Sequence, residues 1–137
     1  MTRTTHGSSP RMNVALWTVQ GLLAALFLFA GGMKLVIPVE ALAAQSPFSG
    51  EFMRFIGVCE TLGALGLVLP GLFRIARWLT PVAAVGLVII MIGATTVSLG
   101  MSVAGAAVPF VLGILAAVVA HGRRPVVRRF AAVYKRA

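Results

Sequence analysis

Acidic residues and cysteine are scarce in this chain. Of its 137 residues only three are Asp or Glu, against twelve Lys and Arg, and there is a single cysteine, Cys59. One cysteine excludes an intramolecular disulfide, a CxxC redox pair and a cysteine-rich metal site, and no metal site is expected. Charged residues make up 11% of the chain and hydrophobic residues 59%, whereas soluble domains are about 25% charged. The composition therefore predicts a small, single-domain membrane protein.

Four apolar stretches approach or exceed the length needed to cross a bilayer as a helix, about 17–25 residues. They lie at Asn13–Met33, Phe52–Leu69, Leu79–Leu99 and Met101–Ala120. Pro38, Pro47 and Gly50 are predicted to separate the first two spans, and Pro70-Gly71 to end the second. After the third span we expect a long bent hairpin. The predicted fold is all-α, a bundle of four transmembrane helices within residues 13–121.

The cations predict the orientation of these spans. The opposite side of the predicted bundle holds only Lys34 and Arg54, while the other ten Lys and Arg precede the first span, follow the second or follow the fourth. Cytoplasmic loops carry the excess of Lys and Arg, so both termini are predicted to be cytoplasmic. The net charge of +9 is explained in the same way, and we expect the lipid bilayer rather than nucleic acid as partner.

The two ends of the chain lack the signals of a packed core. Residues 1–12 are predicted to form a disordered N-terminal tail. Residues 122–137 combine basic and apolar side chains, which fits a helix lying on anionic lipid. A disordered basic tail is the alternative for this segment.

Glu60 is the first candidate for a functional residue. It lies inside an otherwise apolar span, where a carboxylate costs about 2.5–3.5 kcal/mol on insertion scales and normally faces protein or water. Small residues at helical spacing share its face, namely Gly57, Gly63 and Ala64, with Leu67 beyond them. Glu60 is therefore predicted to point into the bundle. It is either a ligand anchor or proton carrier, or one partner of an interhelical hydrogen bond or ion pair.

Lys34 ends the inward stripe of the first span and has two predicted conformations. Its long side chain either snorkels to the outer interface or turns down to contact Glu60, which lies about 10 Å below that interface by helix rise. Gln20 lies on the same stripe near the other membrane surface. We expect Gln20 to be a hydrogen-bonded core amide.

Three further residues are predicted at the depth of Glu60. Thr95 and Ser98 belong to the third span and Pro109 to the fourth, where proline frees a backbone carbonyl. Hydroxyl groups in membrane helices often bond the carbonyl four residues earlier, which is the alternative for Thr95 and Ser98. Together with Glu60, these residues predict a cavity open toward the non-cytoplasmic side.

Several segments together resemble a known family. They are Ala30-Gly31-Gly32-Met33-Lys34-Leu35, Phe55-Ile56-Gly57-Val58-Cys59-Glu60, Gly63-Ala64-Leu65-Gly66-Leu67, Leu69-Pro70-Gly71 and Leu79-Thr80-Pro81. Over roughly residues 13–122 the chain resembles the DoxX-like family of small four-helix bacterial membrane proteins. The resemblance implies a multi-pass protein of the bacterial plasma membrane.

Two hypotheses for the function follow. The family resemblance implies a subunit associated with an oxidoreductase, which would hold a quinone or other apolar ligand near Glu60. The alternative is a non-enzymatic membrane scaffold or assembly factor, in which Glu60 holds helices together. Either would work with a protein partner or as a homo-oligomer. A proton-coupled transporter is disfavoured by the single intramembrane acid and the lack of a detectable inverted repeat.

Overall fold

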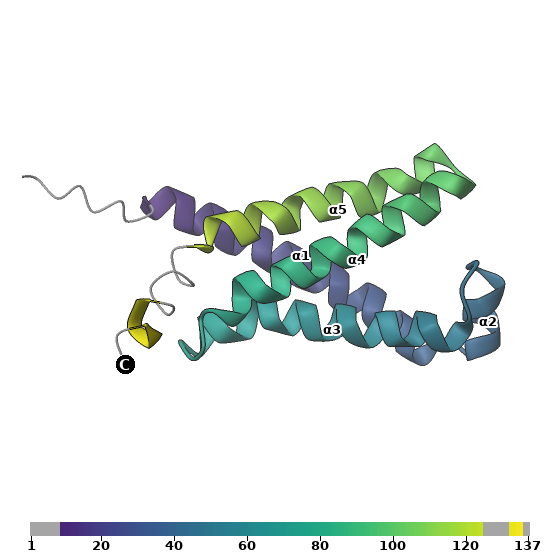
Figure 1. The fold of residues 1–137 in the computed structure, drawn as a ribbon, viewed down its shortest axis with the longest axis horizontal. Helices are drawn as coiled ribbons and strands as arrows, with labels where there is room; N and C mark the ends of the chain where they lie inside the picture. Colours follow the sequence, from purple (N-terminus) through teal and green to yellow (C-terminus); the bar gives the residue numbers. More distant parts are fainter. Residues whose placement is uncertain (1–8, 125–131, 136–137) are drawn as a thin grey trace, which may run out of the picture.

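The computed structural model describes residues 9–124 and 132–135, and within these ranges the chain contains helices and no strands. The helices are α1 (Pro10–Val36), α2 (Val39–Ala44), α3 (Gly50–Leu72), α4 (Leu79–Met101) and α5 (Val103–Gly122) (Figure 1). All except the short α2 are long and apolar enough to cross a membrane. The prediction of an all-α fold with four candidate transmembrane helices is confirmed.

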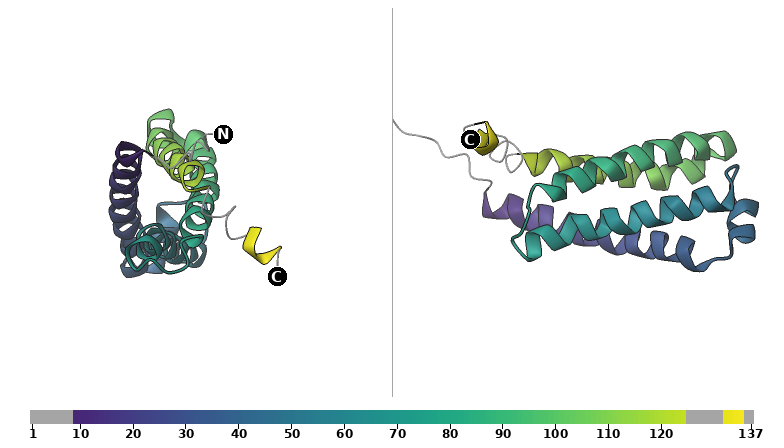
Figure 2. Two further views of the ribbon diagram at one scale, coloured as in Figure 1. Left: turned by 90° about the vertical axis from the view of Figure 1, so that its left-hand side faces the viewer. Right: turned by 60° about the horizontal axis from the view of Figure 1, so that its bottom comes forward.

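The four long helices pack as two pairs. α1 packs mainly against α3 and α4 against α5, and contacts between α3 and α4 join the pairs. The first residues of α1 and the last residues of α5 lie at one end of the bundle, which we call the terminal end (Figure 2). The opposite end, the α2 end, carries α2 packed against α3.

Each long helix buries a narrow stripe and exposes apolar side chains elsewhere. The centre of the core is formed by Leu23, Phe27, Leu67, Leu87 and Val119. On α3 the predicted inward residues Gly57, Glu60, Ala64 and Leu67 are buried. The side chains on the other side of α3 are exposed: Phe55, Val58, Leu62, Leu65 and Leu69. An apolar exterior of this kind suits a bilayer rather than water.

Most helix boundaries differ from those predicted by two or three residues, and two of them show how the ends are formed. α1 begins at Pro10, where Ser9 Oγ accepts from the N–H of Met12 at 3.3 Å as an N-cap. α3 does not end before Pro70 but runs through it to Leu72. Proline has no N–H, so the intrahelical bond from position 70 to the carbonyl of Gly66 is missing. The N–H of Phe73 still donates to the carbonyl of Leu69 at 3.0 Å, so the last turn closes.

The connections are tighter than predicted. α2 fills a segment that we expected to be irregular, and its Val-Glu-Ala-Leu-Ala-Ala sequence follows Pro38 directly. Between α4 and α5 a single residue, Ser102, is extended, and its hydroxyl caps α5 by accepting from Gly105 N–H at 3.0 Å. Of the predicted tails, residues 1–8, 125–131 and 136–137 lie outside the described residues. Residues 132–135 form a helical turn.

Candidate functional site

Two glycines bring the functional side chains of α1 and α3 together. A Cβ atom added to Gly31 would lie 2.7 Å from the carbonyl oxygen of Gly57, and one added to Gly57 would lie 2.7 Å from Cβ of Lys34. Only glycine at both positions allows this close approach of the two helices. Lys34 and Glu60 each follow one of these glycines by three residues, so they come from the same face and meet beside the crossing.

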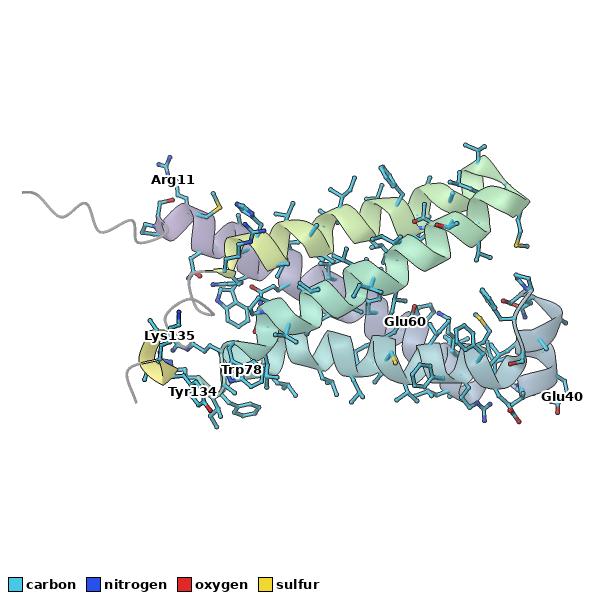
Figure 3. All side chains as sticks on the ribbon, in the orientation of Figure 1. Arg11, Glu40, Glu60, Trp78, Tyr134 and Lys135 are labelled. Carbon is cyan, nitrogen blue, oxygen red and sulfur yellow. The ribbon has the colours of Figure 1, made fainter. Side chains whose placement is uncertain are left out.

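Lys34 and Glu60 form an ion pair inside the bundle. The distance from Nζ of Lys34 to Oε2 of Glu60 is 2.8 Å, and the two side chains are 22% and 5% exposed. Of the two conformations predicted for Lys34, the structure contains the inward one. Glu60 lies part of the way along the bundle, between the terminal end and the α2 end (Figure 3).

A cavity of about 640 Å³ adjoins this ion pair between α3 and α4, toward the α2 end. Among the residues that the structure describes, Lys34 and Glu60 are the only charged ones that line it. α3 and the preceding loop contribute aromatic side chains, and α4 contributes small and apolar ones: Phe48, Phe52, Phe55, Ile90, Gly93, Ala94 and Val97. We call this space the ion-pair cavity.

The ion-pair cavity is open on its side. Phe55 and Ile89 line it and are nevertheless 62% and 64% exposed. Since both belong to helices able to span a membrane, this opening faces the region that lipid chains occupy. An apolar molecule dissolved in the bilayer can therefore enter without crossing water.

The structure brings together some of the predicted site residues and separates others. Ser98 lines the ion-pair cavity with Lys34 and Glu60. Thr95 and Pro109 line a different cavity of about 370 Å³ between α4 and α5. The hydroxyl of Thr95 donates to the carbonyl of Met91 at 2.7 Å, as the structural alternative for this residue predicted.

Sequence reasoning overlooked the aromatic wall and the proximity of Cys59. Phe48 and Phe52 have ring centroids 5.1 Å apart, and Phe52 and Phe55 6.4 Å apart. The spacing of three residues between Phe52 and Phe55 was the available signal, because such residues share a helix face. Phe48 precedes α3 and carried no such signal. Cys59, a free and half-buried thiol, also lines the ion-pair cavity.

Arg54 positions the α2 end of the site. Its Nη2 donates to the carbonyl oxygen of Ile37 at 2.7 Å, just beyond the end of α1. This bond ties the junction of α1 and α2 to α3. The loop that follows α2 then covers the cavity with Gln45, Ser46 and Pro47.

The fold and the site define a class of protein: a small multi-pass membrane protein with a charged pair in an apolar, laterally open cavity. Among the described residues no three His, Cys, Asp or Glu side chains lie close enough to hold a metal ion.

The chain matches the DoxX-like family over residues 18–121 and belongs to this family, as its sequence motifs predicted. Comparison with curated proteins and with solved structures gives no significant match.

Proposed function

We propose that this protein is a membrane subunit that holds a quinone or other apolar ligand in the ion-pair cavity for an oxidoreductase partner. The observation that carries the proposal is the pairing of Lys34 with Glu60, the only charged side chains among the described residues that line this apolar cavity. Binding sites for small molecules typically enclose about 300–1,000 Å³ and combine apolar walls with a few polar groups. The ion-pair cavity, at about 640 Å³, falls in this range.

The ion pair offers a partner to both forms of a quinone. The ammonium group of Lys34 has three N–H donors and uses one on Glu60. A second can donate to a quinone carbonyl oxygen. A quinol hydroxyl can instead donate to the Glu60 carboxylate. The electrons are assigned to the protein partner, and the role of this chain is to hold the ligand.

We also propose the membrane in which this protein lies and its orientation there. The protein is placed in the bacterial plasma membrane with the terminal end in the cytoplasm. Support comes from the cations, because cytoplasmic segments carry the excess of Lys and Arg. Arg11, Arg74, Arg77 and Arg123 belong to the terminal end, whereas Lys34 and Arg54 lie toward the α2 end. The ion-pair cavity then opens into the outer half of the bilayer.

The single thiol allows a direct test of ligand binding. Cys59 lines the cavity and is the only cysteine in the chain, so its modification by N-ethylmaleimide reports on the cavity alone. A ubiquinone analogue with a decyl tail is suitable, because its fully substituted ring has no C–H position for thiol addition. We expect the analogue to slow modification of Cys59 in a saturable manner. In a Cys59→Ser, Val118→Cys control, whose thiol lies on the exposed face of α5, it should have no effect.

Filling the cavity should abolish this protection. Ala94 lines the ion-pair cavity from α4, and Ala94→Trp would occupy the space that the ligand needs. Ala107→Trp adds the same ring on an exposed position of α5 and is the matched control. Unchanged protection in the Ala94→Trp variant, or none in the parent chain, would refute quinone binding at this site.

One observation favours the alternative, a membrane scaffold. Lys34 already neutralises Glu60 between α1 and α3, so the carboxylate is explained without any ligand. A Lys34→Met, Glu60→Met double variant separates the two functions, since replacing both members of a buried ion pair by apolar residues is often neutral for stability. If the site binds a ligand, the double variant keeps its fold and loses protection of Cys59. A scaffold role predicts that only partner capture, measured by crosslinking, changes.

A further inference from the structure

A third cavity lies at the terminal end and differs in chemistry from the ion-pair cavity. It has a volume of about 520 Å³ and is formed where the ends of the four long helices come together. Its polar lining includes Asn13, Gln20, Arg74, Arg77, Thr80 and Arg123. We call it the arginine pocket.

Arg123 is held in place by the first helix. Its Nε donates to Oε1 of Gln20 at 2.8 Å and its Nη1 to Oδ1 of Asn13 at 3.0 Å. Gln20 is itself buried and donates to the carbonyl of Leu67 at 2.6 Å. The guanidinium also lies 5.7 Å from the ring centroid of Trp17. Its remaining nitrogen, Nη2, is buried without a hydrogen-bond partner.

The positive charge of the arginine pocket has no acidic side chain to balance it. The three carboxylates of the chain are Glu40, Glu51 and Glu60, and none of them lines the pocket. Glu40 lies at the opposite end of the bundle from Trp78 (Figure 3). Burial, and then the nearby charge of Arg77, lower the pKa of the Arg123 guanidinium below its usual value. An unfilled hydrogen-bond donor and uncompensated charge are thus found in one place.

From this geometry we propose that the arginine pocket binds a phosphate group, carried by an anionic lipid headgroup or by a soluble phosphate compound. Guanidinium groups match phosphate oxygens in a bidentate geometry, and phosphate offers several acceptors to several arginines. The N-terminus of α4 adds to the attraction. Its first turn has no acidic residue and no side-chain cap, and Thr80 of that turn lines the pocket. The partial positive charge at the N-terminus of a helix favours anions.

The position of the pocket suits a lipid headgroup. It is formed at the ends of helices able to span a membrane, and basic pockets between helix ends are a known mode of recognition for anionic headgroups. Trp17 lines the pocket, and tryptophan is typical of the membrane interface. The experiment must nevertheless separate the lipid from a soluble source.

The test measures both sources on the purified full chain in mild detergent. In one arm, native mass spectrometry follows retention of phosphatidylglycerol against phosphatidylcholine offered at equal concentration. In the other arm, thermal unfolding is followed with and without inorganic pyrophosphate. Preferential retention of phosphatidylglycerol supports a lipid headgroup as the ligand. Stabilisation by pyrophosphate without lipid preference supports a soluble phosphate compound.

Variants of the loop between α3 and α4 identify the pocket. Arg74→Gln and Arg77→Gln change exposed side chains. Arg123 itself is not substituted, because it also ties α1 to the end of α5. A charge-assisted hydrogen bond contributes roughly a tenfold change in affinity, so each variant should weaken phosphate binding by about tenfold. Arg11→Gln is the matched control, since Arg11 is an exposed cation of the same end that does not line the pocket. It should change binding by less than about twofold.

Two results would overturn the proposal. One is equal retention of both lipids together with no effect of pyrophosphate. The other is a loss of phosphate binding in Arg11→Gln as large as that in Arg77→Gln. This result would show general attraction to a basic surface and not a specific binding site.

Discussion

Lys34 and Glu60 have unequal access to water. Lys34 lies in the last turn of α1 and has a long side chain that can reach the interface on its own. Glu60 is buried in the middle of α3. We therefore expect Lys34→Met, which strands a buried carboxylate, to lower the free energy of unfolding by about 3 kcal/mol. Glu60→Met should lower it by less than about 1.5 kcal/mol, because the lysine can turn outward and still interact with the helix C-terminus.

Unfolding in detergent with increasing dodecyl sulfate measures both free energies. Val36→Met, at an exposed position of the same turn of α1, is the control and should change stability by less than about 0.5 kcal/mol. Equal losses in Lys34→Met and Glu60→Met would contradict the argument, since they would mean that the lysine has no route to the interface.

At the scale of single residues, the sequence predicted how deep in the bundle a side chain lies better than it predicted which cavity the side chain faces. The cost of an intramembrane carboxylate identified Glu60, and counting helix rise placed Ser98 near its level. Counting the rise per residue along the helices also grouped Thr95 and Pro109 with them, although both line the separate cavity between α4 and α5. Neighbouring helical residues point about 100° apart, so Ala94 faces the ion-pair cavity while Thr95 does not. Which side of α4 meets α3 is decided by packing and cannot be read from one helix.

Among the helices, the crossing of α1 and α3 depends most on residue size. Gly31→Ala would place Cβ 2.6 Å from Oγ1 of Thr61 and 2.7 Å from the backbone oxygen of Gly57. The backbone cannot yield as a side chain can, so the helices must separate. Overpacking of this kind costs about 1–3 kcal/mol, and we expect Gly31→Ala to lower the free energy of unfolding by this amount.

The adjacent glycine supplies the control for this prediction. A Cβ at Gly32 meets nothing within 4 Å, so Gly32→Ala should be neutral or stabilise the helix by up to about 1 kcal/mol. The same detergent unfolding measurement applies to both variants. If Gly31→Ala proved as stable as Gly32→Ala, the close contact at the crossing would not be needed for the fold.

The long helices were predictable because each is a continuous apolar run with an inward stripe of small or buried residues. Their details were not. Pro70 lies inside the last turn of α3, although the local sequence Pro70-Gly71 indicates the end of a helix. α2 is six residues long, too short to be stable alone. Contacts with α3 hold it in place, and these contacts depend on the tertiary fold.

For the whole molecule, the ion-pair cavity and the arginine pocket differ in charge, and they lie toward opposite ends of the bundle. The ion-pair cavity balances one cation with one anion, whereas the arginine pocket gathers cations alone. The sequence indicated only that basic residues crowd one side. It did not show that Arg123 bonds to Gln20, because these residues are 103 positions apart and come together only when α1 and α5 meet. The excess of basic residues at the terminal end therefore includes three arginines that line one pocket, Arg74, Arg77 and Arg123, which the bias of loop charges alone would not predict.

The proposed orientation of the protein in the membrane predicts which end of the bundle is accessible from outside the cell. Ala43→Cys on α2 and Ile75→Cys in the loop between α3 and α4 are exposed positions at the two ends of the bundle. Each is introduced singly into a Cys59→Ser background, which has no other thiol. Because Lys and Arg are retained on the cytoplasmic side, a membrane-impermeant maleimide should label Ala43→Cys in intact spheroplasts. It should label Ile75→Cys only after permeabilisation. The reverse pattern would move the ion-pair cavity to the cytoplasmic half of the bilayer, and labelling of both positions from outside would contradict a spanning α3.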